Sequence, residues 1–191
     1  MRRIKTNYTV LGLIALVVIV GIISFYFLPS VGQGTLVLKI TDKINLTNVT
    51  SIEITISKVE VHKAATGEIV NETNETIETN ETITAGWETV VEESNTFNLL
   101  EIKGVEEFLG EKTLEEGKYT QIRLEISSAS IIVDGTEHDL KIPSQKFKLI
   151  HPFTIVADGT TTLVLDFDAS ESVVKAGQKY NLHPVVKVIE E

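Results

Sequence analysis

Residues 51–63 read SIEITISKVEVHK, and this stretch decides the fold class because its apolar side chains recur at every second position. Three isoleucines alternate with polar residues, and the alternation then shifts by one position to Val59 and Val61. An alternating pattern predicts a β-strand with one face in a core and the other in water. The shift predicts a β-bulge near Ser57 and Lys58.

The same two-residue period recurs along most of the remaining chain. It is found in Leu36–Ile40, Trp87–Val91, Ile122–Ile126, Ile131–Val133, Asp139–Ile142, Phe147–Leu149, Phe153–Ile155, Leu163–Phe167 and Tyr180–Val188, and Phe97–Ile102 has the composition of a strand end. About eight to ten short strands with glycine-containing turns predict an all-β fold, an antiparallel β-sandwich. Asp158 and Gly159 predict a hairpin turn. Val105, Phe108 and Leu109 have helical spacing and predict one short helix.

Two tyrosines follow glycines near predicted strand starts. Leu114, Gly117 and Tyr119 have the spacing of the tyrosine corner of Greek-key sandwiches, in which the hydroxyl bonds to backbone across an arch. Gly177 and Tyr180 form a looser version of the same pattern. We interpret the first as a device that stabilises the fold and not as a binding site.

An uncharged apolar run, Val10–Leu28, follows the basic residues Arg2, Arg3 and Lys5. As a helix its 19 residues span about 28 Å, which is close to the thickness of the hydrocarbon core of a bilayer. Basic residues beside a first apolar segment stay in the cytoplasm. We therefore expect residues 1–9 inside the cell, a single transmembrane helix, and the rest of the chain outside.

Two interpretations of this apolar segment stay open. Phe25–Phe27, an aromatic cluster at the outer end, suits the membrane interface and favours a retained anchor. Ser30–Gly32 offers a site with small residues at its two ends, so a signal peptide cleaved near Gly32 is the alternative. Residues 29–33 read as a linker, and residues 34–191 have the length of one extracytoplasmic domain.

The net charge and the lack of cysteine argue against several classes of function for this chain. The chain has 17 basic and 27 acidic residues, and three of the basic ones precede the apolar segment. The outer part therefore has 14 basic against 27 acidic residues, a formal net charge of −13. Such a charge argues against binding of nucleic acid or of anionic lipid headgroups. The absence of cysteine excludes disulfides, thiolate catalysis and thiolate metal sites.

Asn-x-Ser/Thr triplets are more frequent than chance would give. One of them, at Asn7, falls on the inner side and is expected to stay unmodified. The predicted glycosylation sites on the outer side are Asn45, Asn48, Asn71, Asn74 and Asn80. N-glycosylation at these acceptors indicates an archaeal or eukaryotic cell surface.

A triplet repeat, NETNETIETNET, fills residues 71–82. It holds no aromatic residue and cannot supply one face of a core. We interpret residues 67–86 as an exposed, glycan-rich insertion in the domain, so its deletion is expected to leave the fold intact.

Seven motifs in order carry a resemblance to a known family. They are GTLVLKITD (34–42), SIEITISKVEVHK (51–63), GW (86–87), FNLLEI (97–102), LEEGKYTQIRLEI (114–126), TTLVLDFDASESV (161–173) and YNLHPVVKV (180–188). In order and spacing they resemble the archaeal and bacterial surface domain catalogued as domain of unknown function 4382. The resemblance implies a secreted or membrane-tethered sandwich, immunoglobulin-like or prealbumin-like, and it supplies no catalytic residue.

Two acidic groups contain candidate ligands for calcium, a cation that prefers oxygen. One lies in the turn DGTEHD, residues 134–139, and the other on and beyond the strand that ends near residue 167. Their members are Asp134, Glu137, His138 and Asp139 in the first group, and Asp166, Asp168 and Glu171 in the second. A solvated turn and outward-facing strand acids are the favoured interpretations. We therefore expect no cofactor and no metal site, with calcium as the alternative.

No catalytic signature is evident. The histidines, His62, His138, His151 and His183, form no zinc-protease pair, and no GxSxG elbow is present. The two His-Pro pairs predict strand edges or bulges. Trp87 is expected to anchor the core beneath the insertion, with an exposed sugar-stacking platform as the alternative.

The function expected is that of a membrane-tethered, N-glycosylated cell-surface domain, without enzymatic activity, in a structural, adhesive or accessory role in the cell envelope. Its expected partners are the membrane, through Val10–Leu28, and envelope proteins or glycans, but no nucleic acid. Three alternatives stay open: a ligand- or calcium-binding surface module, an envelope hydrolase, and a secreted subunit. The last would assemble by addition of the strand Gly34–Asp42 to a neighbouring sheet after cleavage near Gly32.

Overall fold

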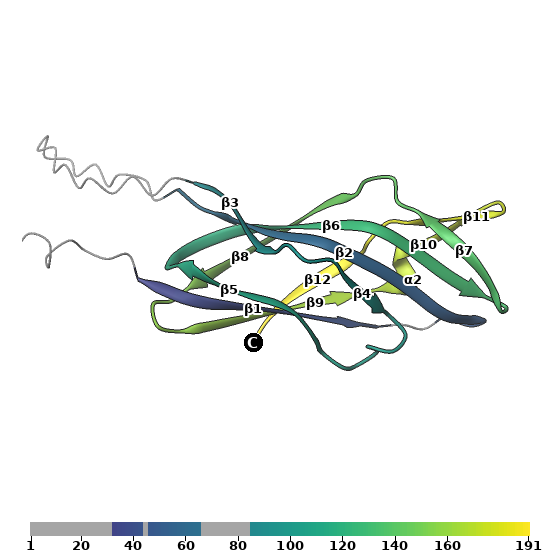
Figure 1. Cartoon of the computed structure of the whole chain (residues 1–191), viewed down its shortest axis with the longest axis horizontal. Coiled ribbons are helices and arrows are strands. Elements are labelled where there is room, and N and C mark those ends of the chain that lie inside the picture. The colour runs from purple at the N-terminus through teal and green to yellow at the C-terminus, as the bar shows by residue number, and fades with distance from the viewer. Residues whose placement is uncertain (1–31, 44–45, 66–84) are drawn as a thin grey trace, which may run out of the picture. The chain divides into compact units, whose positions relative to one another are not determined.

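Two β-sheets contain most of the residues that the computed structural model describes, which are residues 32–43, 46–65 and 85–191 (Figure 1). Apolar side chains from both sheets form one core between them, so the predicted all-β sandwich is confirmed. The described part of the chain has twelve strands, more than the eight to ten expected, and one short helix.

Two predicted segments lie outside the described residues. They are the apolar run Val10–Leu28 and residues 67–84 of the predicted insertion. The predicted end of the insertion is wrong by one residue, because Gly86 begins the strand Gly86–Val91. In the described residues, no helix is long and apolar enough to cross a membrane. The unit Gly32–Glu191 is compact, and its first strand begins at Gln33, the last residue of the predicted linker.

The smaller sheet has four strands in the order β12 (Val186–Glu190), β9 (Thr160–Phe167), β1 (Gln33–Asp42) and β5 (Glu107–Glu115). Alternate side chains of β1 are buried, as its sequence pattern predicts. β1 runs antiparallel to β5 but parallel to β9. The prediction of a purely antiparallel sandwich is therefore wrong at the β1–β9 pair, which joins strands far apart in the sequence. It is wrong again in the larger sheet, where β11 (Lys179–Leu182) runs parallel to β7 (Thr136–Lys141).

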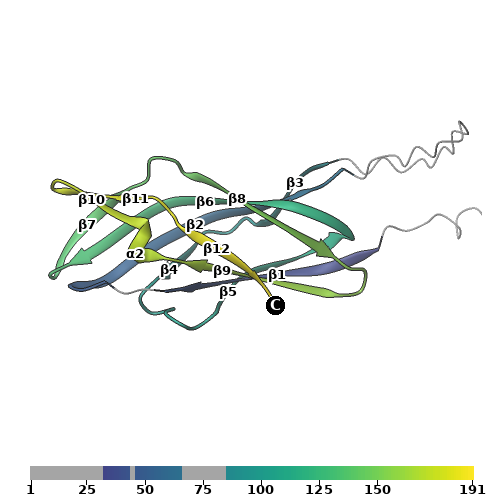
Figure 2. The ribbon, with the colours of Figure 1, turned by 180° about the vertical axis from the view of Figure 1, so that it is seen from behind.

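The larger sheet is built on two long antiparallel strands, β2 (Val49–Lys63) and β6 (Gly117–Val133). Four shorter strands pair with β2 or β6, and two more extend the sheet because β11 pairs with β7 and β10 pairs with β11. They are β3 (Gly86–Val91), β4 (Asn95–Asn98), β7 (Thr136–Lys141), β8 (Lys146–Ile155), β10 (Val173–Ala176) and β11 (Lys179–Leu182). At one end the order is β8-β6-β2-β3, so β8 and β3 lie at opposite edges (Figures 1 and 2).

The register of β2 keeps its apolar residues on the inner face. It shifts against β6 between Ile56 and Lys58, so the predicted bulge is confirmed. Because the bulge changes the phase, Val59 and Val61 lie buried on the same side as Ile52, and all three are 0% exposed. Burial of each such side chain stabilises the folded state by about 1.5–3 kcal/mol.

The turn at Asp158 and Gly159 is not a hairpin. It connects β8, in the larger sheet, to β9, in the smaller one, so the chain crosses between layers at this point. The turn is bonded to β1, because the Asp158 amide donates to the Gln33 carbonyl at 2.8 Å and the Thr35 amide to the Gly159 carbonyl at 2.8 Å. The hairpin prediction is wrong because a turn sequence does not specify which sheet the next strand joins.

The predicted helix at residues 105–109 is also wrong. β5 begins at Glu107, and only Leu109 of the three apolar residues is buried, whereas Val105 and Phe108 are 56% and 61% exposed. Pairing along β1 decides the conformation here, since tertiary contacts override a short local pattern. The one helix among the described residues is α2 (Ala169–Ser172).

The tyrosine corner is confirmed at Tyr119. Its side chain is 0% exposed, and its hydroxyl donates to the Glu115 carbonyl at 3.0 Å. Glu115 ends β5 and Gly117 begins β6, so this bond spans the connection between the two sheets. Gly117 has φ +136°, a conformation that favours glycine. Burial raises the pKa of the Tyr119 phenol above its usual value, so the hydroxyl stays protonated.

Candidate functional site

Trp87 lies on the outer face of the larger sheet, near the start of β3, and is only partly buried. The His62 ring, from β2, meets the indole with 5.0 Å between ring centroids. The Arg123 guanidinium, from β6, lies 3.7 Å from the indole centroid. Such a cation–π contact contributes roughly 0.5–2 kcal/mol. The expectation that Trp87 anchors the core is wrong, because β3 presents it outward, opposite His62.

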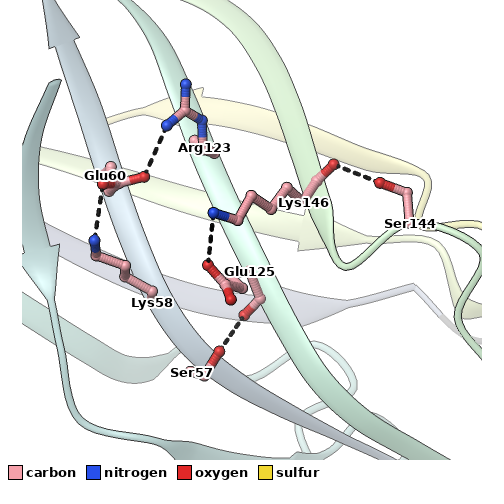
Figure 3. Close-up of polar contacts among 7 residues, drawn as sticks. All are labelled: Ser57, Lys58, Glu60, Arg123, Glu125, Ser144 and Lys146. Carbon is pink, nitrogen blue, oxygen red and sulfur yellow. Dashed lines mark hydrogen bonds and ion pairs between the residues drawn. The ribbon is translucent and has the colours of Figure 1, made fainter.

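Charged side chains from three strands are linked across the same outer face (Figure 3). Glu60 accepts a hydrogen bond from Arg123 Nη1 at 3.1 Å and pairs with Lys58 at 2.9 Å. The hydrogen bonds from Lys58 and then Arg123 lower the pKa of the Glu60 carboxyl. Because Glu60 bonds to Arg123, it holds the guanidinium in place over the indole. Separately, Glu125 pairs with Lys146 of β8 at 3.6 Å.

β8 adds an unpaired cation near the indole and an exposed apolar side chain further along the same outer face. Lys148 Nζ lies 5.9 Å from the Trp87 ring centroid, and no ion pair joins Lys148 to a carboxylate of the described residues. Ile150, two positions further along the same face of β8, is 79% exposed. We call the surface formed by Trp87, His62, Arg123, Lys148 and Ile150 the Trp87 face. Its fixed guanidinium and free ammonium suit recognition of an acidic group.

A groove of about 300 Å³ lies where β3 meets β5, at the edge of the larger sheet away from β8. Apolar and acidic side chains line it together, including Val91, Phe108, Glu92, Glu93 and Glu111. Phe108 is 61% exposed, and the three glutamates are exposed. We call this feature the Phe108 groove. Its rim has the opposite charge to the Trp87 face.

Two buried carboxylates lie at one end of the smaller sheet. Asp42, at the end of β1, is 1% exposed, and Asp166 of β9 is 5% exposed. One Asp42 oxygen accepts the Ala169 amide at 3.0 Å, and Asp166 pairs with Lys43 at 2.9 Å. Their other oxygens have no hydrogen-bond partner among the described residues. Burial raises the pKa of Asp42 from 3.8 to about 6, so ionisation of Asp42 destabilises the folded domain.

The acidic groups weighed as calcium ligands do not converge. In the turn at residues 134–139 the carboxylates are exposed, whereas Asp166 is buried, so the interpretation of Asp166 as an outward-facing acid is wrong. Asp168 instead caps α2, accepting the Glu171 amide at 3.1 Å. Across residues 32–43, 46–65 and 85–191, no cluster of three or more His, Cys, Asp or Glu side chains is placed to hold a metal ion.

The four histidines lie in four separate environments. His62 contacts Trp87, and His138 of β7 lies 5.1 Å from Tyr180, measured between ring centroids. His151, with the proline after it, falls where the register of β8 shifts against β6, so the bulge predicted there is confirmed. His183 lies in the loop after β11, where its amide donates to the Ser172 carbonyl at 2.8 Å.

Of the predicted glycosylation sites, the structure describes Asn48. It is exposed in the turn before β2, with φ 66°, and its carbonyl accepts the Asp134 amide at 2.9 Å. An exposed turn is accessible to a modifying enzyme, and Asn48 stays a predicted acceptor. The other predicted acceptors lie outside the described residues, and they are Asn45, Asn71, Asn74 and Asn80.

Comparison with known proteins gives one match. Residues 33–184 match the family model described as Domain of unknown function (DUF4382), which confirms the resemblance seen in the sequence. Neither a curated protein nor a solved structure matches the chain. The matched region includes both the Trp87 face and the Phe108 groove.

Proposed function

Because the chain belongs to the DUF4382 family, a family described without an assigned activity, we propose its function from its own residues. It is a membrane-tethered, N-glycosylated cell-surface domain with a structural, adhesive or accessory role in the cell envelope. The role is one of binding and not of catalysis. Val10–Leu28 is the tether, residues 1–9 are cytoplasmic, and the sandwich is extracellular.

The observation that carries this proposal is the uncharged run Val10–Leu28 with basic residues only on its N-terminal side. The sandwich begins soon afterwards, at Gln33, so a short linker joins the tether to the folded domain. Five of the six Asn-x-Ser/Thr triplets follow the tether, where glycosylation outside the cell requires them. Exposed Asn48 is one of them.

The domain supports a binding role through the Trp87 face. Trp, Tyr and Arg are enriched among the few residues that dominate the energetics of protein interfaces. Here Arg123 and Trp87 are fixed by Glu60 and by their own stacking, so little side-chain entropy would be lost on binding. We also propose that the sandwich is immunoglobulin-like or prealbumin-like, as the tyrosine corner at Tyr119 supports.

Assembly by donation of the strand Gly34–Asp42 has less support. This strand is β1, which lies between β5 and β9 in its own sheet and is paired on both sides. Its three inward side chains, Leu36, Leu38 and Ile40, are 0% exposed. Donation would remove a central strand and its core residues, and this favours the retained tether.

Intact mass of the chain isolated from native membranes tests the proposed function. We expect a mass that includes residues 1–31 plus glycan, and loss of the added mass after chemical deglycosylation. The variant Asn48→Gln should lose one glycan unit and keep the rest. A mass that begins near Gly32, or one equal to the bare polypeptide, would overturn the proposal.

A further inference from the structure

Two surfaces of this domain combine an exposed large apolar side chain with charges that lack an ion-pair partner among the described residues. On the Trp87 face, Ile150 is 79% exposed beside the unpaired Lys148. In the Phe108 groove, Phe108 is 61% exposed beside Glu111. Isolated exposed apolar residues are ordinary, but these two lie within a basic patch and an acidic groove respectively.

The charge of the Trp87 face contrasts with that of the chain. Three cations, Arg123, Lys146 and Lys148, lie on adjacent positions of β6 and β8, in a chain of net charge −10. Arg123 and Lys146 each have one carboxylate partner, whereas Lys148 lies near the indole and has no ion pair with the described residues. The face can therefore pair with added acidic groups without losing an existing ion pair.

The Phe108 groove is complementary in charge and in shape. Its volume of about 300 Å³ leaves room for an inserted side chain. Glu92, Glu93 and Glu111 on its lining form no ion pair with the described residues, so an incoming cation would meet free carboxylates. Gly110 on the lining packs closely against Val91, because a Cβ there would lie 2.6 Å from a methyl group of Val91.

We propose that the Trp87 face of one copy of this chain binds the Phe108 groove of the next copy. Ile150 enters the groove beside Phe108, and Lys148 pairs with Glu111 on its rim. Charge complementarity within a single sequence is the reason to choose a second copy as the partner. The proposal goes beyond the envelope role and does not depend on membrane attachment.

The position of the two surfaces determines the form of the assembly. The Trp87 face extends to β8 and the groove lies at β3, which are opposite edges of the larger sheet. A contact between different surfaces of identical subunits continues from copy to copy and produces rings or open chains. Pro152 and the bulge on β8 disfavour simple strand addition at that edge, so side chains make the contact.

The test is a charge exchange in the full chain, purified in detergent where its N-terminal segment requires it. The variants are Lys148→Glu and Glu111→Lys, followed by sedimentation velocity over a concentration series. The wild type should associate. Each variant alone should associate at least about tenfold more weakly, because like charges then face each other. An equimolar mixture of the two variants should recover association. Raising the salt concentration should weaken the wild-type contact.

Matched controls separate this contact from general charge effects. Lys179→Glu makes the same charge change at an exposed position of β11, away from both surfaces, and should associate as the wild type does. Ile150→Ser should also weaken association, without a change in charge. Circular dichroism confirms that each variant is folded. A monomeric wild type, equal behaviour of the two lysine variants, or a mixture that fails to recover would each overturn the proposal.

Discussion

Replacement of Asp42 by asparagine should stabilise the domain at neutral pH. Asp42 is 1% exposed, and one of its oxygens accepts no hydrogen bond from the described residues. Asparagine has nearly the same shape, keeps a carbonyl oxygen for the Ala169 amide, and carries no charge. The variant therefore removes the buried charge and preserves the packing.

The magnitude follows from the pKa of Asp42, which burial raises from 3.8 to about 6. Nearby Asp168 and Asp166 add smaller raising contributions, and backbone hydrogen bonds from Ala169 and Lys43 lower it. Because the folded-state pKa is raised, the folded domain binds the proton more tightly than the unfolded chain does. Protonated Asp42 therefore stabilises the folded domain, and this contribution is present below pH 3.8 and is lost as the pH rises to about 6. About two pKa units correspond to about 3 kcal/mol.

The assay is chemical denaturation of the wild type and Asp42→Asn at pH 4 and pH 8. At pH 8 the variant should be about 3 kcal/mol more stable, which raises the melting temperature by roughly 6–12 °C for a domain of this size. At pH 4 the two proteins should differ little. Asp139→Asn, at an exposed position of β7, is the matched control and should show no such difference.

Two results would refute this reasoning. One is a difference between wild type and variant that is the same at pH 4 and pH 8, because it would show that Asp42 does not titrate with a raised pKa. The other is a less stable variant at pH 8, because it would show that the carboxylate forms an interaction that outweighs its desolvation.

Three further predictions follow from the core, the insertion and the acidic groups. Tyr119→Phe removes the hydroxyl that donates to the Glu115 carbonyl; denaturation should show a loss of about 1–2 kcal/mol, and an unchanged stability would contradict the tyrosine corner. Deletion of residues 67–84 should preserve a single cooperative thermal transition, and a broad or split transition would show that the insertion is part of the core. The melting temperature should be the same in millimolar calcium and in chelator, whereas a rise with calcium would establish a cation site.

Much of the fold could be predicted from the sequence because burial in a sandwich follows the two-residue period of its strands. The alternation in β2 specified both the buried face and the bulge beside Ser57. The spacing from Gly117 to Tyr119 specified a bond across the arch. These features depend on residues close together in the chain, and local patterns carry that information.

The errors concern contacts between distant segments. Asp158 and Gly159 are residues typical of a turn, but their identity does not specify the partner of the next strand. That strand, β9, pairs with β1 of the smaller sheet and not with β8. Trp87 was expected in the core because of its size, whereas its strand position places it opposite His62 on the outer face.

The candidate site was missed for a related reason. Arg123, Lys148 and Ile150 are ordinary outward positions in their own strands, and only the pairing of β2, β3, β6 and β8 brings them onto one outer face with Trp87. The buried Asp42 gave no signal either, because its burial depends on α2 covering the end of β1.

Labelling of single cysteines on intact cells tests the central claim most directly, since the chain contains no cysteine of its own. The variants are Lys179→Cys, exposed on β11, and Asn7→Cys, before the apolar run. A maleimide that cannot cross membranes should label Lys179→Cys on intact cells and should label Asn7→Cys only after permeabilisation. Labelling of Lys179→Cys only after permeabilisation would contradict an extracellular domain tethered by Val10–Leu28.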